Sequence, residues 1–408
     1  MPRTRTSPAT QRWPLLLAAG WMLALCSAGS GASAVRGSSP ARTTHAAIPG
    51  EAAGGGPVAQ LVQTAATIRA PLARSTYDVN GAGLTCAVLD TGARVTHVDF
   101  ADRVLATRNF TSDNGGDPTN VTDVDGHGTN SAGVIAANDI HTGLAPGANL
   151  AIVKVLNNEG AGDSDTVGNG LQWVIENHAA LNISVVSMSV SDNQNYLRHQ
   201  DFPGDPGGVR AKIQTLRALN IPVVVSAGNE YGRFESRQGM SWPAIFPETV
   251  SVGGTYDANV GADQLNGARA NTTARDRILP YSQRLHESVN PTDRTDIFAP
   301  GAEVTSSGNS GNRASSTFKG TSESAPVVSG VILLIQQYFR RQTGNLPTVD
   351  QVEAFLRARA VTINDGDDED DNVQNTGLNF LRLDAVRVLD AVAAGISGPT
   401  LSNCRLNP

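Results

Sequence analysis

Apolar, β-branched runs alternate along this chain with segments whose apolar residues recur every three or four positions. Runs that are apolar on both faces are typical of strands buried inside a parallel sheet. Alternation of such strands with helices predicts an α/β fold, with a doubly wound, mostly parallel central sheet and helices on both faces. The predicted strands are 85–89, 150–155, 183–190, 222–227 and 249–252, and the predicted helices are 127–137, 164–177, 207–219, 322–342 and 384–394.

The first 34 residues have the pattern of a secretory signal peptide. Three arginines precede an apolar run from Trp13 to Cys26, and the small residues Ala32-Ser33-Ala34 offer a cleavage site. The apolar run has 14 residues, too few to span a membrane comfortably. The pattern predicts a protein that is secreted, or exported to a periplasm, and that has no stable membrane insertion after signal removal.

The remaining chain divides by composition into three parts. Residues 35–75 are rich in Ala, Gly, Ser, Thr and Pro, which is typical of a low-complexity linker or a short pro-segment. Residues 76–395 carry the strand and helix pattern and form the expected main domain, and residues 396–408 form a short C-terminal tail. The strands of such a sheet present functional residues at their carboxyl ends.

Composition narrows the function without deciding it. The chain has 408 residues, of which 40% are hydrophobic and 17% charged, enough for a sizeable core in a loop-rich protein. Its net charge of −7 argues against nucleic acid or an anionic membrane as a partner. Two cysteines remain after the signal, Cys86 and Cys404. They form either one bridge, or a buried apolar side chain and a separate tail thiol.

Three motifs carry polar reactive residues in glycine-rich contexts. They are Leu89-Asp90-Thr91-Gly92, Gly126-His127-Gly128-Thr129 and Gly320-Thr321-Ser322-Glu323-Ser324-Ala325-Pro326. Each has a plainer interpretation by itself: a turn aspartate, a surface histidine and a helix-capping serine. Together they supply a carboxylate, an imidazole and a hydroxyl, the parts of an activated serine nucleophile. Pro326 is expected in the first turn of a helix that Ser322 opens.

The order Asp, His, Ser is the subtilisin order, and the chain resembles a subtilisin-like serine peptidase (subtilase) over roughly residues 76–395. The resemblance implies that Ser322 is the nucleophile, His127 the general base and Asp90 the residue that orients it. Asn229, which ends the run Val223–Asn229, corresponds to the family's oxyanion-hole asparagine. The substrate-binding residues implied are Ser189, Val190 and Ser191 on one strand, with Ala227 and Gly228 as pocket walls.

The chain departs from the family pattern at three places. Asn130 replaces a second, non-catalytic histidine, and Ser191 stands where the family often has glycine. Glu323, directly after the nucleophile, stands where the family usually has methionine. A carboxylate there would disfavour acidic residues on the leaving side of the substrate, or raise the pKa of His127.

The resemblance implies a serine endopeptidase that acts on protein or peptide substrates through an acyl-enzyme, with no cofactor required for chemistry. With the signal-peptide pattern and the acidic charge, the expectation is a secreted monomer with no nucleic-acid partner. Calcium is common in the family, and the oxygen-rich run 365–372 is a candidate structural calcium site. Such a run is also typical of a solvated loop. Two other functions stay open: a catalytically weak or inactive scaffold that acts as a binding module, and a transpeptidase or peptide cyclase on the same fold.

Overall fold

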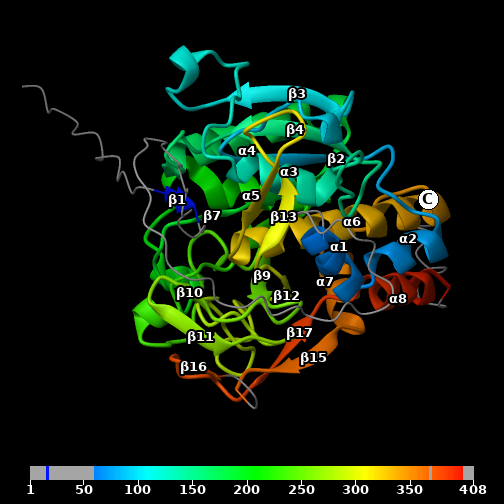
Figure 1. Ribbon diagram of the computed structural model, residues 1–408. Helices are drawn as coiled ribbons and strands as arrows, with labels where there is room; N and C mark the ends of the chain where they lie inside the picture. The colour runs from blue at the N-terminus through cyan, green and yellow to red at the C-terminus, as the bar shows by residue number, and fades with distance from the viewer. Residues whose placement is uncertain (1–14, 18–58, 367–369, 398–408) are drawn as a thin grey trace, which may run out of the picture.

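A nine-stranded sheet forms the centre of the protein (Figure 1). The computed structural model describes residues 15–17, 59–366 and 370–397. Along the sheet the strands follow the order β15 (Val361–Asn364), β17 (Asn379–Arg382), β12 (Ile297–Pro300), β9 (Val250–Thr255), β8 (Val223–Ser226), β6 (Ile183–Met188), β2 (Thr85–Asp90), β4 (Asn149–Lys154) and β3 (Val104–Asn109). All neighbours pair in parallel except β15 with β17. The predicted fold class is confirmed.

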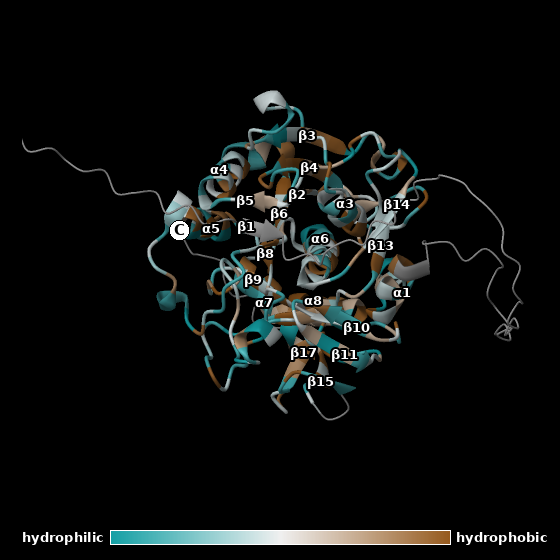
Figure 2. Cartoon of the chain, turned by 60° about the vertical axis from the view of Figure 1, so that its left-hand side comes forward, coloured by the Kyte–Doolittle hydropathy of each residue, from teal (hydrophilic) through white to brown (hydrophobic). Residues whose placement is uncertain are grey.

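Helices cover both faces of this sheet. The helices α3 (His127–Ala136), α6 (Thr321–Thr343) and α8 (Ala385–Ser397) pack into one hydrophobic core, and α4 (Ser164–Leu181) and α5 (Val209–Ala218) pack into another. Within β2, Cys86 and Val88 enter the first core, whereas Ala87 and Leu89 enter the second. This alternation is the two-residue period of a strand buried on both sides. Figure 2 shows hydrophobic strands inside the molecule and hydrophilic loops around it.

The chain starts the sheet at β2 and then builds outward in both directions. The strands β4 and β3 lie on one side of β2, and β6, β8 and β9 lie on the other. Such a reversal of strand order leaves a crevice at the carboxyl ends of the strands, where ligands bind in α/β proteins. Asp90 is the last residue of β2 and therefore lies at this crevice.

Two helices precede β2 in the chain. The predicted linker or pro-segment 35–75 includes α1 (Ala59–Thr67) and most of α2 (Ala70–Tyr77). Leu61, Ile68 and Ala73 are buried in the first core, and Arg69 forms a bidentate ion pair with Asp384 at the start of α8. In Figure 1 the blue α2 lies beside the red α8, and α1 lies near β13. Two packed helices therefore lie within the predicted segment, because the spacing of these apolar residues gives an amphipathic helix despite the alanine-rich composition, and the division at residue 76 stays a prediction.

Smaller elements complete the described chain. The sheet β10 (Asp263–Leu265), β11 (Ala268–Thr272), β16 (Asp370–Asp371) and the hairpin β13 (Val304–Ser307), β14 (Ser315–Phe318) lie outside the main sheet. A further helix, α7 (Val349–Ala358), packs against α8. Short 3-10 turns occupy Val98–Phe100, Asn114–Gly116, His199–Asp201, Pro206–Gly208 and Gly232–Phe234.

One short strand comes from the N-terminal region. β1 (Leu15–Leu17) pairs antiparallel with both β5 (Ala161–Gly162) and β7 (Val190–Ser191). The rest of the predicted signal peptide, Cys404 and most of the tail 396–408 lie outside the described residues. Among the residues that are described, no helix is long and apolar enough to cross a membrane.

Candidate active site

Asp90 is held at the end of β2 by hydrogen bonds to its carboxylate. The backbone N–H of Thr91 donates to Asp90 Oδ1 at 2.7 Å, and the hydroxyl of Ser131 on α3 donates to Oδ2 at 3.3 Å. The side chain is 1% exposed. An ionised carboxylate at such a depth requires a partner, because burial without one is costly.

His127 is that partner, and it opens α3. Its Nδ1 lies 2.8 Å from Asp90 Oδ1 and 3.0 Å from Oδ2. Gly128 makes the close approach possible, because a Cβ at this residue would lie 2.1 Å from the carbonyl oxygen of Gly92. A ring edge-to-face contact with Phe318, with 5.3 Å between centroids, also fixes the imidazole. The carboxylate on Nδ1 leaves Nε2 as the nitrogen that can accept a proton.

Asp123 ties the first two motifs together, and the sequence analysis did not select it. Its carboxylate accepts hydrogen bonds from the hydroxyl of Thr91, the N–H of Gly126 and the N–H and hydroxyl of Thr129. The threonines of the Asp-Thr-Gly and His-Gly-Thr motifs therefore share one buried acceptor. Their common partner fixes the end of β2 against the start of α3.

Ser322 lies in the first turn of α6, as expected, and it is fully buried. Gly320 precedes the helix with φ 131°, a backbone conformation that side chains with a Cβ rarely adopt. The position of Pro326 differs from the expectation, because α6 begins at Thr321 and the proline is its sixth residue. Proline has no N–H to donate to the Ser322 carbonyl four residues before it. The hydroxyl of Ser189 donates to that carbonyl instead, at 2.7 Å.

Asn229 lies three residues beyond β8, beside the start of α6. Its Oδ1 accepts hydrogen bonds from the N–H of Thr321 at 2.9 Å and from the Thr321 hydroxyl at 3.1 Å. These bonds orient the amide, and its Nδ2 donates to no atom of the described residues. A buried donor held in place next to a nucleophile is the arrangement that an oxyanion hole requires. Thr321 was missed by the sequence analysis, although it lies inside the Gly-Thr-Ser motif.

The predicted binding residues lie on both sides of this centre. Val190 and Ser191 form β7, whose backbone pairs with β1. The Ser191 hydroxyl accepts from the N–H of Asn193 at 2.9 Å, so it caps a local turn. Ala227 and Gly228 follow β8, and the N–H of Gly228 donates to the Thr321 hydroxyl at 3.2 Å. The described contacts thus bring the predicted substrate strand and pocket residues to the start of α6.

Two buried groups, His127 and Glu323, dominate the electrostatics of the centre. Burial opposes the charging of His127, but the charges of Asp90 and Glu323 and the hydrogen bond that His127 donates to Asp90 outweigh it and raise the pKa of the imidazole to about 10. Burial raises the pKa of Glu323 to about 7. Burial also raises the pKa of Glu230, next to Asn229, to about 7.

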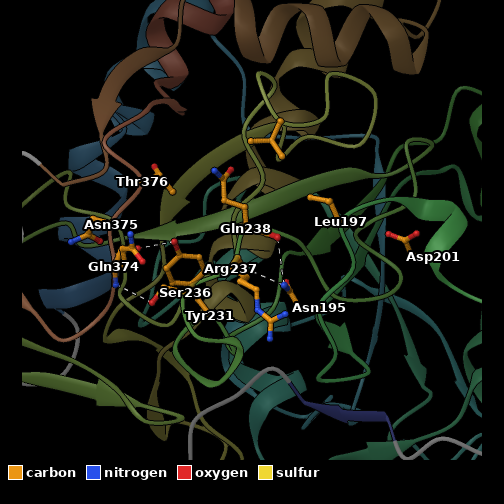
Figure 3. A pocket seen from close by; sticks show the side chains of 11 residues that line it. Asn195, Leu197, Asp201, Tyr231, Ser236, Arg237, Gln238, Gln374, Asn375 and Thr376 are labelled. Atoms are coloured by element: carbon orange, nitrogen blue, oxygen red, sulfur yellow. Dashed lines mark hydrogen bonds between the residues drawn. The ribbon is translucent and has the colours of Figure 1, made fainter.

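A polar cavity of about 610 Å³ lies beyond the predicted binding residues. Its walls include Asn195, Tyr231, Arg237 and Gln374, whose side chains line it in Figure 3. The Tyr231 hydroxyl donates to the Gln374 carbonyl at 2.9 Å. None of the nine predicted site residues lines this cavity, so it is not the predicted centre.

The predicted calcium run stays a prediction. Residues 367–369 lie outside the described chain, and the Asp365 carboxylate already forms a buried ion pair with Arg284, with 3.0 Å between Oδ2 and Nε. Among the described residues no group of three or more His, Cys, Asp or Glu side chains is arranged to hold a metal ion.

A model of the subtilase family matches residues 81–381, which is most of the chain. The chain belongs to the subtilase family. The family resemblance predicted from the three motifs is therefore confirmed, and the protein is a subtilisin-like serine peptidase, a hydrolase.

Relatives of this subtilase include proteins named for different compartments. It is 32% identical over 260 residues to an intracellular serine protease of Paenibacillus polymyxa, covering 63% of this chain and 68% of the relative. It is 31% identical over 264 residues to the major intracellular serine protease of Bacillus subtilis (strain 168), covering 64% and 70%. It is 29% identical over 275 residues to an extracellular serine proteinase of Thermus sp. (strain Rt41A), covering 66% and 54%.

Proposed function

We propose that this subtilase is an endopeptidase in which Ser322 attacks the peptide carbonyl, His127 transfers the proton and Asp90 orients the imidazole. The observation that supports it best is the buried contact of 2.8 Å between His127 Nδ1 and Asp90, with Nε2 turned toward the first turn of α6, where it lies 3.4 Å from Glu323. Ser322 and Glu323 are neighbours in that turn. The general base therefore lies at the end of the helix that carries the nucleophile.

The oxyanion formed in this reaction would bind two N–H groups. One is the Nδ2 of Asn229, whose orientation is fixed by Thr321. The other is the backbone N–H of Ser322 in the first turn of α6, where the helix dipole favours a developing negative charge. The acyl-enzyme that follows is released by water, and no residue in this sequence of steps requires a cofactor.

Peptide substrates would bind by strand addition. In the structure β1 lies between β5 and β7, with Leu16 paired to Ala161 on one side and to Ser191 on the other. An extended substrate backbone fits the same two edges, because main-chain hydrogen bonds of this kind do not depend on side chains. We propose these two strand edges as the binding site for substrate residues on the acyl side of the scissile bond, with Ala227 and Gly228 as pocket walls.

We also propose that the protein is exported. The support is the arginine-rich and apolar pattern of residues 1–34. Export would be tested by expressing the full chain in its source cells and by sequencing the N-terminus of protein found outside the cytoplasm. An intact N-terminus on protein retained in the cytoplasm would contradict export.

The peptidase proposal is tested with a fluorophosphonate probe, which labels activated serines. Purified full-length protein and the S322A, H127A and S324A variants would be treated in parallel. Ser324 is a matched control, because it is buried in the same helix and its hydroxyl donates to the Ala299 carbonyl at 3.0 Å. Labelling of wild type and S324A, with none of S322A or H127A, is expected.

The outcome also separates the alternative functions. Wild-type protein that is folded but takes no label would overturn the catalytic proposal and favour a binding scaffold. If label is taken up, product analysis of a cleaved peptide with an added amine would follow. Predominant amide formation would identify a transpeptidase, whereas free acid products support hydrolysis.

A further inference from the structure

Glu323 places a second carboxylate against the imidazole of His127. Its Oε1 lies 3.4 Å from Nε2, and both side chains are fully buried. Neither carboxylate oxygen of Glu323 accepts a hydrogen bond from any described residue. Buried carboxylates ordinarily have hydrogen-bond donors, whereas in the part of the chain that the structure describes Glu323 has an ion-pair contact with the imidazole alone.

Three acidic side chains face His127, each from a different part of the fold. Asp90, at the end of β2, faces Nδ1. Asp125, in the loop before α3, accepts from the backbone N–H of His127 at 3.1 Å. Glu323, on α6, faces Nε2, while the ring of Phe318 adds a neutral contact. Only Glu323 therefore faces the nitrogen that must accept the proton of the nucleophile.

A negative charge at this place has a definite effect on the imidazole. Ionised Glu323 stabilises the imidazolium form, in which Nε2 carries a proton and cannot act as a base. Its influence is strong because both groups are removed from water, which would screen them. Burial lowers the pKa of His127, but the charges of Asp90 and Glu323 raise it to about 10, which agrees with this direction.

We propose that Glu323 is a positioning residue that retains a proton on Nε2 of His127 and so moves the onset of peptidase activity to more alkaline pH. The inference rests on the proposed role of His127 as the general base. The same carboxylate stabilises the imidazolium that forms when the base takes the proton of Ser322. Glu323 thus sets the pH range of the reaction without touching the substrate carbonyl.

The test is the pH dependence of kcat/KM for an uncharged peptide substrate, which reports the ionisation of the free enzyme. In E323Q of the full chain, we expect the midpoint of the acidic limb to fall by at least one pH unit. E323D retains a carboxylate and should keep the midpoint closer to that of wild type. E230Q is a matched control: it removes a buried carboxyl of similarly raised pKa that lies beside Asn229 rather than His127, and it should leave the midpoint unmoved.

A midpoint that is the same in wild type and E323Q would overturn the inference, as would an equal shift in E230Q. Failure of the proposed function is distinguishable, because wild type would then show no labelling by the fluorophosphonate probe. If E323Q does not fold, ¹⁵N NMR titration of histidine in the wild type decides, with His127 assigned by comparison with H127Q. A Nε2 protonation midpoint above pH 8 supports the inference, and a midpoint near the ordinary histidine value of about 6.5 overturns it.

Discussion

The hydrogen bond from Ser189 to the Ser322 carbonyl gives a prediction that is specific to this helix. The bond is 2.7 Å long and buried. In S189A the carbonyl loses this donor, and Pro326 has no N–H to replace it. A buried acceptor that loses its donor costs about 1–3 kcal/mol. We expect the free energy of unfolding of S189A to fall by that amount.

The P326A substitution should compensate. Alanine at position 326 provides an N–H directed along the helix toward the same carbonyl. The double variant S189A/P326A should therefore lose less stability than the sum of the two single changes. A net hydrogen bond is worth about 1 kcal/mol, so the coupling free energy should be about that size.

Urea denaturation, followed by tryptophan fluorescence, measures this coupling. All variants would carry S322A, which prevents self-digestion and leaves the backbone carbonyl in place. S324A is the control, because its hydroxyl donates to Ala299, and its effect should add to that of P326A. The reasoning is refuted if S189A and P326A also add to within about 0.5 kcal/mol, the range for independent sites.

Three further predictions concern separate parts of the molecule. Asp99 is fully buried, which raises the pKa of its carboxyl, but hydrogen bonds from His141 and Ser307 lower that pKa to about 2. H141A should therefore lower the free energy of unfolding by about 3–5 kcal/mol, measured by urea denaturation at pH 7. Since the pKa of Asp99 is lowered by folding, this stabilisation is present above about pH 4 and is lost as the pH falls toward 2. A loss of unfolding free energy below about 1 kcal/mol in H141A at pH 7 would contradict the prediction. N229A should lower kcat by roughly 10²–10³-fold with little change in KM, because this is the loss found for an oxyanion-hole asparagine in a subtilisin. An unchanged kcat would show that Asn229 is not part of the oxyanion hole. L16P removes the backbone N–H of a residue that pairs with both β5 and β7, so it should weaken the pairing of β1 and speed labelling of the full chain by the fluorophosphonate probe. A labelling rate equal to that of wild type would show that β1 does not compete with ligands.

The buried strands were predictable because each is uniformly apolar, whereas edge elements were not. The five predicted strands correspond to β2, β4, β6, β8 and β9 to within a few residues. β3, at one edge of the sheet, contains Arg108 and is only partly buried, so it lacks the apolar signal. β12 was missed because it is four residues long and ends in Pro300. Short segments carry too little periodicity for assignment without tertiary contacts.

Candidate site residues could be selected from the sequence, but their contacts could not. Motif order selected Asp90, His127 and Ser322, and the family resemblance added Asn229, because reactive residue types in glycine-rich contexts are recognisable along the chain. Asp123 gave no such signal, since its role depends on three partners that the fold brings together. Long-range hydrogen bonds of this kind are decided by how elements pack.

Glu323 shows why packing decides chemistry next to a nucleophile. Successive residues of a helix point about 100° apart, so adjacency to Ser322 in the sequence does not place the carboxylate near the base. Its contact with Nε2 depends on the rotation of α6 against α3, which the core between them fixes. A methionine in the same place would remove the carboxylate that lies 3.4 Å from Nε2 of the imidazole. The residue after the nucleophile therefore acts on the base rather than on the serine, and its charge sets the pH at which the base is free.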